Sequence, residues 1–523
     1  MKKPMVFMFI AFAVILLAGC GSSTYEESQA TDDECAYEEG YIYEEGYTHD
    51  EVYTHDEVYT HDETCESQYE SRCNEPSQES PVYIAPPDEA DIRCFNPGDD
   101  KPAEHDFPIP LELAAQFFAE LCALFTADGG YLWGACLHTP FIFLYPATRD
   151  IVANQPDSQG ILTRVGNVYV GTLPDRFPAL YSFPRIGDRQ WAMAPWAIIP
   201  QGDEHKNHRM RTMTHMSFHA QQRALFGSSE DWDNSHMNEK DARITIQLEI
   251  NALTHALRST GDERLEAIRD ALAIRAERRR LFPRRVRSEN LFEFHEGIAD
   301  YTDKRLTGLS MDEILSSIEG RADSIRYHPS MAGIFGYASG ALYGFLLDDT
   351  GVFWREGLRY GVDLGQLLQD ALGITELPPF YEIDLAQYGY EDILAFETER
   401  VLSHERMLQD IADSFAKQAT LSIPDSLITD DMQLNPARVF TFDNLGRVFG
   451  ATVIVSGRFG RLELYDGFYV RARHGGTYHG MVIATGMEID GHRVYGQGWV
   501  LEINDGFGIS TENGNYVVGR ALS

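Results

Sequence analysis

The alternation of apolar and polar residues divides the chain into stretches with different periods. From Leu111, the segment LELAAQFFAELCALF repeats apolar residues at helical spacing and stops at a Gly-Gly pair, which predicts one helix. The short apolar runs FIFLY, NVYVGTL and QWAMAPWAII follow, and prolines separate them. We therefore expect folded structure from about Asp106, beginning with a helix and a small β-sheet.

From Asp203 to about Phe415 the apolar residues recur with the period of an α-helix. This pattern predicts helices over His205–Leu225, Asp241–Leu257, Asp262–Leu281, Glu289–Leu306, Met311–Ile318 and Ile334–Leu347. After Pro424 the pattern alternates with a period of two between glycine turns, which predicts strands. The expected fold class is α+β, with a small sheet and a mostly helical region over residues 104–420. A β-rich C-terminal module over residues 427–523 is expected to follow.

The first twenty residues, MKKPMVFMFIAFAVILLAGC, differ in composition from the rest of the chain. Lys2 and Lys3 precede an apolar run of signal-peptide length, which is short for a membrane-spanning helix. The run ends Leu-Ala-Gly-Cys at Cys20, and this ending resembles the lipobox of bacterial lipoproteins. The resemblance implies that residues 1–19 are removed, that Cys20 is lipidated, and that the chain is anchored on the outer side of a bacterial membrane. An ordinary cleaved signal peptide is the alternative.

Residues 20–103 are expected to form an acidic, disordered tether. The part from Gly21 to Thr64 holds 15 Asp and Glu residues and no Lys or Arg, and the unit Tyr-Thr-His-Asp-Glu-Val recurs in it. Such an acidic segment with few aliphatic residues cannot form a core. It is either a solvated spacer or a weak cation-collecting tract. The formal net charge of the whole chain is -38, which argues against nucleic acid as a partner.

Candidate chemistry begins with two histidines in the segment RMRTMTHMSFHAQQRAL. His215 and His219 are four residues apart in a predicted helix, so both imidazoles face the same side. This is the spacing of the H-E-x-x-H motif, whose histidines bind zinc, but Met216 stands where that motif has its glutamate. Two polar residues on a helix surface also produce this spacing by chance, so the pair alone does not establish a metal site.

A second segment, SENLFEFHEGIADYTDKRL, carries Glu296 on a later predicted helix. A catalytic zinc site uses three protein ligands and leaves a fourth position for water. The two segments together resemble the gluzincin metallopeptidases, and residues 146–348 are similar to a group of bacterial zinc peptidases with a zincin-like domain. The resemblance implies that His215, His219 and Glu296 bind one zinc ion. It also implies that Asp300, one turn after Glu296, orients a zinc-bound histidine.

Met216 is the main departure from that family. The glutamate that it replaces takes a proton from the zinc-bound water, and losing such a base costs on the order of 10²–10⁴ in rate. Glu293 and Glu239 are alternative bases. Tyr337 and Tyr343 are candidate donors to a tetrahedral oxyanion, although ordinary packing explains each of them as well.

Two further features suggest contacts with a ligand. The run Gln190–Ile199 is a candidate edge strand that would pair with an extended peptide. A series of arginines either grips an acidic ligand or forms a solvated helix face paired with neighbouring acids; it comprises Arg275, Arg278, Arg279, Arg280, Arg284, Arg285 and Arg287.

Three functions remain open from the sequence. The first is a surface lipoprotein whose zincin-like domain binds zinc, has lost most or all peptidase activity, and holds a peptide or protein ligand. The second is an active zinc-dependent peptidase that uses another base. The third is a metal-free structural or adhesive lipoprotein in which the β-rich module binds the partner.

Overall fold

The computed structural model describes residues 107–521, with the exception of residues 181, 188, 435–438, 443–445, 475 and 476. The expected signal peptide, the lipidated Cys20 and the acidic tether lie outside the described residues. The described chain forms two compact units that divide between Leu394 and Ala395. In the part of the chain that the structure describes, no helix is both long and apolar enough to cross a membrane.

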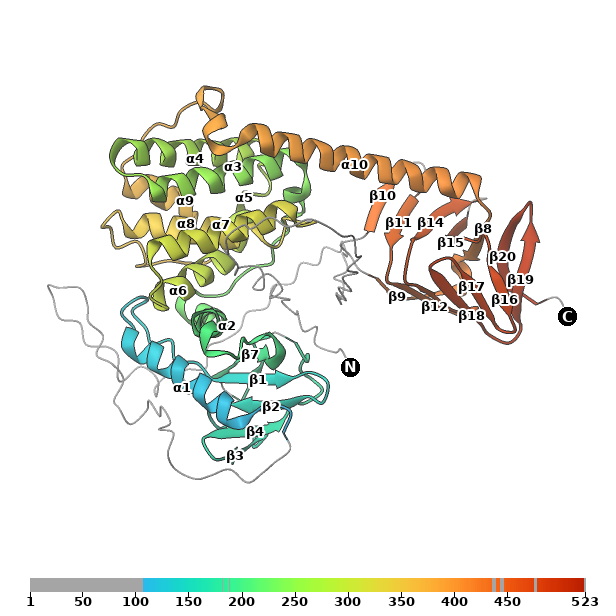
Figure 1. The fold of residues 1–523 in the computed structure, drawn as a ribbon, viewed down its shortest axis with the longest axis horizontal. Helices are drawn as coiled ribbons and strands as arrows, with labels where there is room; N and C mark the ends of the chain where they lie inside the picture. The colour runs from blue at the N-terminus through green and yellow to red at the C-terminus, as the bar shows by residue number, and fades with distance from the viewer. Residues whose placement is uncertain are drawn as a thin grey trace, which may run out of the picture. The chain divides into compact units, whose positions relative to one another are not determined.

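The first unit begins with helix α1 (Leu111–Asp128) and a five-stranded sheet in the order β3-β4-β2-β1-β7 (Figure 1). Its strands are β1 (Phe141–Tyr145), β2 (Asp150–Ala153), β3 (Leu162–Val165), β4 (Val168–Thr172) and β7 (Ala192–Pro195), and a short hairpin of β5 (Arg185–Ile186) and β6 (Arg189–Gln190) lies before β7. Strands β1 and β7 run parallel, and the other neighbouring pairs run antiparallel.

Strand β1 is apolar throughout because both of its faces are covered. Phe141 and Phe143 belong to the main core, whereas Ile142 and Leu144 belong to a separate cluster on the other side of the sheet. This alternation is the two-residue period of a strand. The ring of Phe118, from α1, stacks on Phe143 with a centroid distance of 4.6 Å, so α1 covers the main-core face.

Helices make up the rest of the first unit. They are α2 (Lys206–Phe226), α3 (Lys240–Arg258), α4 (Gly261–Leu281), α5 (Val286–Phe292), a π-helical turn η5 (Glu293–Gly297), α6 (Ile298–Leu306), α7 (Met311–Tyr327), α8 (Phe335–Asp348) and α9 (Leu364–Ala371). The predicted helices are present, with ends shifted by a few residues, and α7 extends further than expected. The helix predicted over Glu289–Leu306 is interrupted by η5.

The turn η5 and helix α8 pack with their backbones almost in contact. A Cβ atom built on Gly340 of α8 would lie 2.6 Å from the Glu293 carbonyl oxygen and 2.7 Å from the Cα atom of Gly297. A Cβ atom on Gly297 would lie 2.5 Å from the Gly336 carbonyl oxygen. Glycine is therefore required on both sides of this contact, because any side chain would push the two elements apart.

Two members of the arginine series are buried in the first unit. Arg278 contacts Glu249 and Glu289, and its Nε atom lies 3.2 Å from Glu289 Oε2. Arg275 lies 2.9 Å from Glu249 and 2.6 Å from Glu293. These five side chains have almost no exposed surface, and each charged group faces a partner of opposite charge. The network joins α3, α4, α5 and η5.

The interpretation of this arginine series as a solvated helix face is therefore wrong for Arg275 and Arg278. It holds for Arg280 and Arg287, which are exposed and pair with Glu277 and Glu230. The sequence pattern does not separate the two groups, because the acidic partners of Arg275 and Arg278 lie on α3, α5 and η5 and meet them only in the folded chain.

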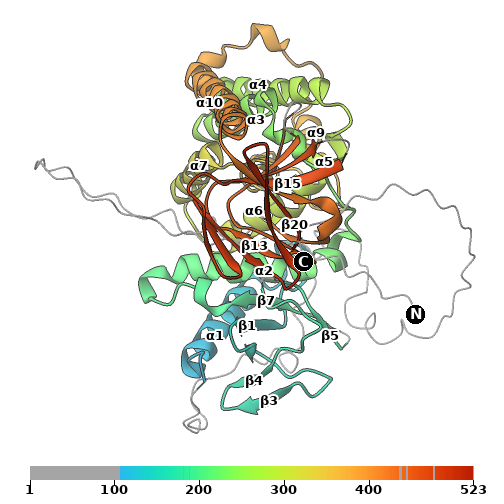
Figure 2. The same cartoon turned by 90° about the vertical axis from the view of Figure 1, so that its right-hand side faces the viewer.

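The second unit is a β-sandwich with a helix against one face (Figure 2). One sheet has the order β10-β11-β14-β15-β8-β20-β19 and the other β16-β17-β18-β13-β12-β9. The strands are β8 (Thr420–Pro424), β9 (Ile428–Gln433), β10 (Val439–Phe442), β11 (Gly446–Gly450), β12 (Val453–Gly457), β13 (Gly460–Leu464), β14 (Phe468–His474), β15 (Thr477–Ile483), β16 (Glu488–Asp490), β17 (Arg493–Gly496), β18 (Trp499–Ile503), β19 (Phe507–Glu512) and β20 (Asn515–Arg520). Leu421, Val455 and Trp499 pack between the sheets.

The division between the units falls inside helix α10 (Tyr390–Lys417), earlier than the boundary expected at residues 420–427. Leu408 and Ile411 of α10 pack on Val448 and Val470 of the first sheet. The C-terminal half of α10 therefore belongs with the β-rich unit. A continuous helical pattern does not reveal such a division, because the period remains the same on both sides of it.

Candidate metal centre

The structure brings three of the predicted ligands together. Helix α2 places His215 and His219 one turn apart, and their Nε2 atoms are 2.9 Å apart. Glu296 reaches them from the π-helical turn η5, with its Oε2 atom 3.1 Å from His219 Nε2 and 3.5 Å from His215 Nε2. Two imidazole nitrogens and one carboxylate oxygen thus converge on one point from two separate elements.

The donor set and its spacing fit a zinc ion. Zinc in proteins takes histidine nitrogen and carboxylate oxygen ligands in a tetrahedral arrangement. Bond lengths of ~2.0–2.1 Å then place neighbouring ligand atoms ~3.3–3.4 Å apart. The three observed separations of 2.9, 3.1 and 3.5 Å lie on both sides of that value. The residues present can therefore hold such an ion after shifts of a few tenths of an ångström.

The second nitrogen of each imidazole is also held. His215 Nδ1 lies 3.2 Å from Asp303 Oδ2, and His219 Nδ1 lies 2.7 Å from Gln222 Oε1. Both partners are acceptors in this arrangement, so they favour a proton on each Nδ1 atom. The Nε2 lone pairs are then directed toward Glu296, as metal ligation requires.

The carboxylate that contacts His215 is Asp303, and not Asp300 as the family resemblance implies. Asp300 is bonded with the buried Lys304, and one of its oxygens lies 3.1 Å from Arg321. Asp303 follows Glu296 by seven residues, which is two helical turns and therefore the same face. The seven-residue spacing from Glu296 to Asp303 is visible in the sequence, but the family motif designates Asp300 instead.

Without a metal ion, electrostatic interactions in the cluster favour a protonated His215 beside an ionised Glu296. Burial lowers the pKa of His215, but its hydrogen bonds with Asp303 and Glu296 outweigh burial and raise the pKa to about 9. Burial raises the pKa of Glu296, but the charge of His219 and hydrogen bonds from both histidines hold it well below its usual range. A metal ion would displace the proton shared by these groups, because ligands bind metals in their deprotonated forms.

No carboxylate replaces the missing base among the candidates from the sequence. Met216 is buried in the apolar core. Glu293 is bonded with Arg275 and accepts a hydrogen bond of 2.6 Å from the Ser339 hydroxyl. Glu239 is exposed at the N-terminus of α3. Glu293 thus belongs to the buried ion-pair network, and Glu239 lies at the start of α3. Neither glutamate takes the place of the general base.

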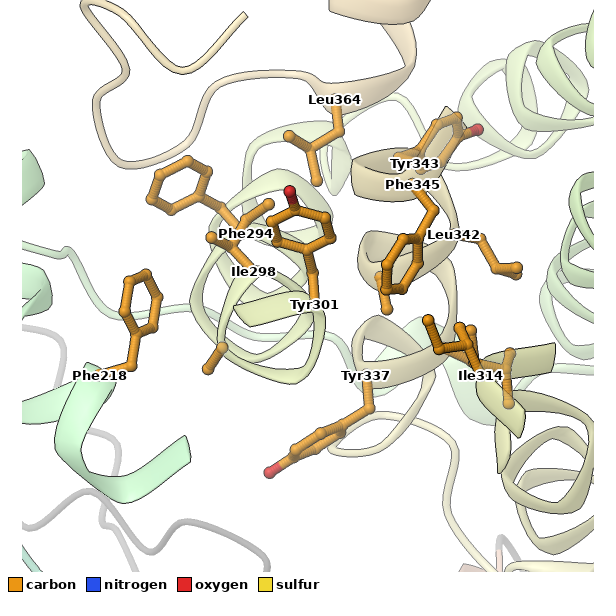
Figure 3. Close-up of a cluster of buried hydrophobic side chains, with 14 of the residues drawn as sticks. Phe218, Phe294, Ile298, Tyr301, Ile314, Tyr337, Leu342, Tyr343, Phe345 and Leu364 are labelled. Carbon is orange, nitrogen blue, oxygen red and sulfur yellow. The ribbon is translucent and has the colours of Figure 1, made fainter. Parts of the chain in front are cut away.

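The two candidate tyrosines point to opposite sides of α8 (Figure 3). Tyr337 donates a hydrogen bond to Glu296, and its ring lies nearly parallel to that of His215, with centroids 5.8 Å apart. Tyr343 instead donates a hydrogen bond of 2.7 Å to Glu249 in the buried ion-pair network. The expectation for Tyr343 is therefore wrong, whereas Tyr337 lies at the candidate metal centre.

The predicted edge strand at Gln190–Ile199 contains β7, the outermost strand of the five-stranded sheet, and an isolated β-bridge occupies part of its outer side. Strand β7 forms this part of the sheet, and Met193 exchanges backbone hydrogen bonds of 3.1 and 3.3 Å with Ser182. The neighbouring Phe183 lies beside the metal centre, with its ring centroid 5.5 Å from that of His219. The side chain of Phe183 thus contacts the cluster, which no periodic pattern indicated.

Comparison with known proteins adds no relative. No protein-family model, curated protein or solved structure matches this chain.

Proposed function

We propose that this chain is a membrane-anchored surface lipoprotein with a zincin-like, gluzincin-type domain that binds one zinc ion and has lost most or all peptidase activity. The observation that carries the proposal is the convergence of His215, His219 and Glu296, with both histidines held through Nδ1. Bound zinc would supply an acidified water molecule and polarise a carbonyl group. Met216 cannot accept a proton from that water, so the domain binds a peptide or protein ligand rather than cleaving it quickly.

The chain's own residues support ligand binding beside this centre. The side chain of Phe183 is half-buried and packs against His219, so it offers an apolar surface next to the cluster. The Tyr337 hydroxyl donates to Glu296 in this structure, and it would have to exchange that bond for one to a carbonyl oxygen of a bound ligand. An extended peptide lying along Ser182 and Phe183 would contact both features.

Metal content of the full chain, purified without chelators, tests the proposal directly. We expect about one zinc ion per chain, and loss of that zinc in His215→Ala, because three protein ligands are needed. The matched control is His255→Ala, since His255 lies on α3, is partly exposed and pairs with Glu263. Absence of zinc from the wild-type chain, even after reconstitution, would favour a metal-free structural or binding lipoprotein instead.

One observation favours the alternative of an active zinc-dependent peptidase. The His295 Nε2 atom lies 4.0 Å from Glu296 Oε1, and the His295 ring lies 4.5 Å from that of His219. Burial and the charge of His219 lower the pKa of His295 to about 3, so this imidazole stays neutral and would be a weaker base toward a metal-bound water than the family's glutamate. Zinc-dependent cleavage of a peptide library by the wild-type chain, abolished in both Glu296→Ala and His295→Ala, would establish this alternative.

Attachment to the membrane is the other half of the proposal. We expect Cys20→Ala to move the protein from the membrane fraction to the soluble fraction of the producing bacterium, because the acyl chains would be lost. Immunoblots of the two fractions measure this shift. Retention of Cys20→Ala in the membrane fraction after a high-salt wash, with the mass of the protein showing that the first 19 residues are gone, would contradict lipid anchoring through this residue.

A further inference from the structure

Gln222 contacts more parts of the candidate metal centre than its place in the sequence suggests. It lies on α2, three residues after His219, and its side chain is fully buried. Its Oε1 atom lies 2.7 Å from His219 Nδ1 and 3.2 Å from the hydroxyl of Tyr360. Its Nε2 atom donates a hydrogen bond of 2.7 Å to the backbone carbonyl of His295.

These contacts fix the orientation of the amide and, with it, the tautomer of His219. The carbonyl oxygen of His295 can only accept a hydrogen bond, so the NH₂ group of Gln222 must face it. The amide oxygen then faces His219 and accepts from both His219 Nδ1–H and the Tyr360 hydroxyl. In the neutral form of His219 that a metal ion requires, the lone pair is consequently on Nε2, the atom that points toward Glu296.

The same side chain also holds the second element of the centre. His295 immediately precedes Glu296 in η5, so the bond from Gln222 to the His295 carbonyl anchors the backbone that carries the carboxylate ligand. Tyr360, from the segment between α8 and α9, completes this arrangement and also contacts His295 Nδ1 at 3.1 Å. One neutral amide thereby connects α2, η5 and the Tyr360 segment.

We propose that Gln222 is the positioning residue that aligns His219 and Glu296 for the metal, and that Tyr360 acts on both through Gln222. This inference rests on the proposed zinc binding. Removing the amide would free the His219 ring to rotate and would release the η5 backbone, so zinc affinity depends on a residue that does not touch the ion. Groups that orient metal ligands typically account for 10–100-fold in metal affinity.

The test measures zinc affinity by competition with a chelator, together with the visible spectrum of the cobalt-substituted protein. For Gln222→Leu we expect zinc binding weakened about 10–100-fold and an altered cobalt spectrum. Gln222→Glu keeps an acceptor for His219 but sets a carboxylate oxygen against the His295 carbonyl, so it should recover only the part of the affinity that depends on the orientation of His219. The matched control is Gln221→Leu, because Gln221 is the neighbouring glutamine on α2 and contacts Thr139 and the His138 carbonyl instead.

The outcomes separate this inference from the proposed function. A wild-type chain that binds zinc, together with a Gln222→Leu variant whose affinity and cobalt spectrum match those of Gln221→Leu, would overturn the inference alone. A wild-type chain that binds no zinc would overturn both. If Gln222→Leu does not fold, Tyr360→Phe tests the same path, because it removes only the hydroxyl that donates to Gln222. An unchanged cobalt spectrum in Tyr360→Phe would then count against the role given to Tyr360.

Discussion

Replacing Met216 with glutamate is expected to turn the zinc-loaded chain into a peptidase whose rate exceeds that of the wild-type chain by about 10²–10⁴-fold. Residue 216 directly follows the ligand His215 and occupies the base position of the H-E-x-x-H motif. The glutamate would take a proton from zinc-bound water and return it to the leaving amine. The measurement is the rate of cleavage of a fluorogenic peptide library, with zinc content determined for the same samples.

Met216→Gln is the matched control, because glutamine has the shape of glutamate without its basic carboxylate. It should stay at the wild-type rate, and Met216→Glu combined with Glu296→Ala should lose any gain. A folded, zinc-loaded Met216→Glu protein with no gain in rate would show that a carboxylate at this buried position does not reach the metal-bound water, or that the peptide-binding side has also lost its catalytic form. That result would not affect the proposed zinc binding. It would contradict only the hypothesis that a glutamate at position 216 is the one group that the site lacks for peptidase activity.

Replacing Arg278 with methionine is expected to lower the free energy of unfolding by about 3–5 kcal/mol. Arg278 is fully buried and is bonded with Glu249 and Glu289, so its removal leaves two buried carboxylates without their main partner. Burial raises the pKa of Glu289, but the charge of Arg278, a hydrogen bond from His236 and the charge of Arg275 together outweigh burial and lower the pKa from 4.5 to about 2. Urea unfolding followed by circular dichroism measures the loss.

The depressed pKa of Glu289 also sets the pH range of this effect. A carboxyl group with a lowered folded-state pKa stabilises the fold above its unfolded pKa, and this contribution is lost as the pH falls from about 4.5 to about 2. The difference between the wild-type chain and Arg278→Met should therefore shrink over that range. Arg280→Met is the control on the same helix, because Arg280 is exposed. The urea concentration at its unfolding midpoint should match that of the wild-type chain. If the unfolding midpoint of Arg278→Met equalled that of the wild-type chain, this result would contradict the stabilising role of the buried ion-pair network around Arg278.

The sequence predicts those features that depend only on the spacing of residues along the chain. The four-residue spacing of His215 and His219 places both on one helix face whatever surrounds them, and the apolar periods locate most of the helices. Glu296 follows as a candidate ligand from the resemblance to the gluzincin motif, because periodicity alone does not single it out. The π-helical turn that carries it left no mark on the apolar pattern, because one widened turn does not interrupt the series of buried residues.

The parts that the sequence did not predict depend on tertiary contacts. Asp303, Gln222 and Tyr360 contact the centre from positions where a polar residue has many possible roles, and only the packing of α2, α6 and the Tyr360 segment selects one. Tyr337 and Tyr343 are six residues apart on one helix, so nothing in their spacing tells which of them faces Glu296. The buried pairing of Arg275 and Arg278 likewise becomes visible only when α3, α4 and α5 are placed together.

The backbone contact between Gly297 and Gly340 limits how this centre can change over evolutionary time. The side chain at position 216 can change without moving the backbone that holds the candidate ligands, since Met216 contributes only packing in the apolar core. The turn that carries Glu296 has no such freedom, since even a single methyl group on Gly340 would collide with the Glu293 carbonyl at 2.6 Å. Side chains at this centre can therefore be exchanged, whereas the backbone contact that positions them requires glycine at 297 and 340.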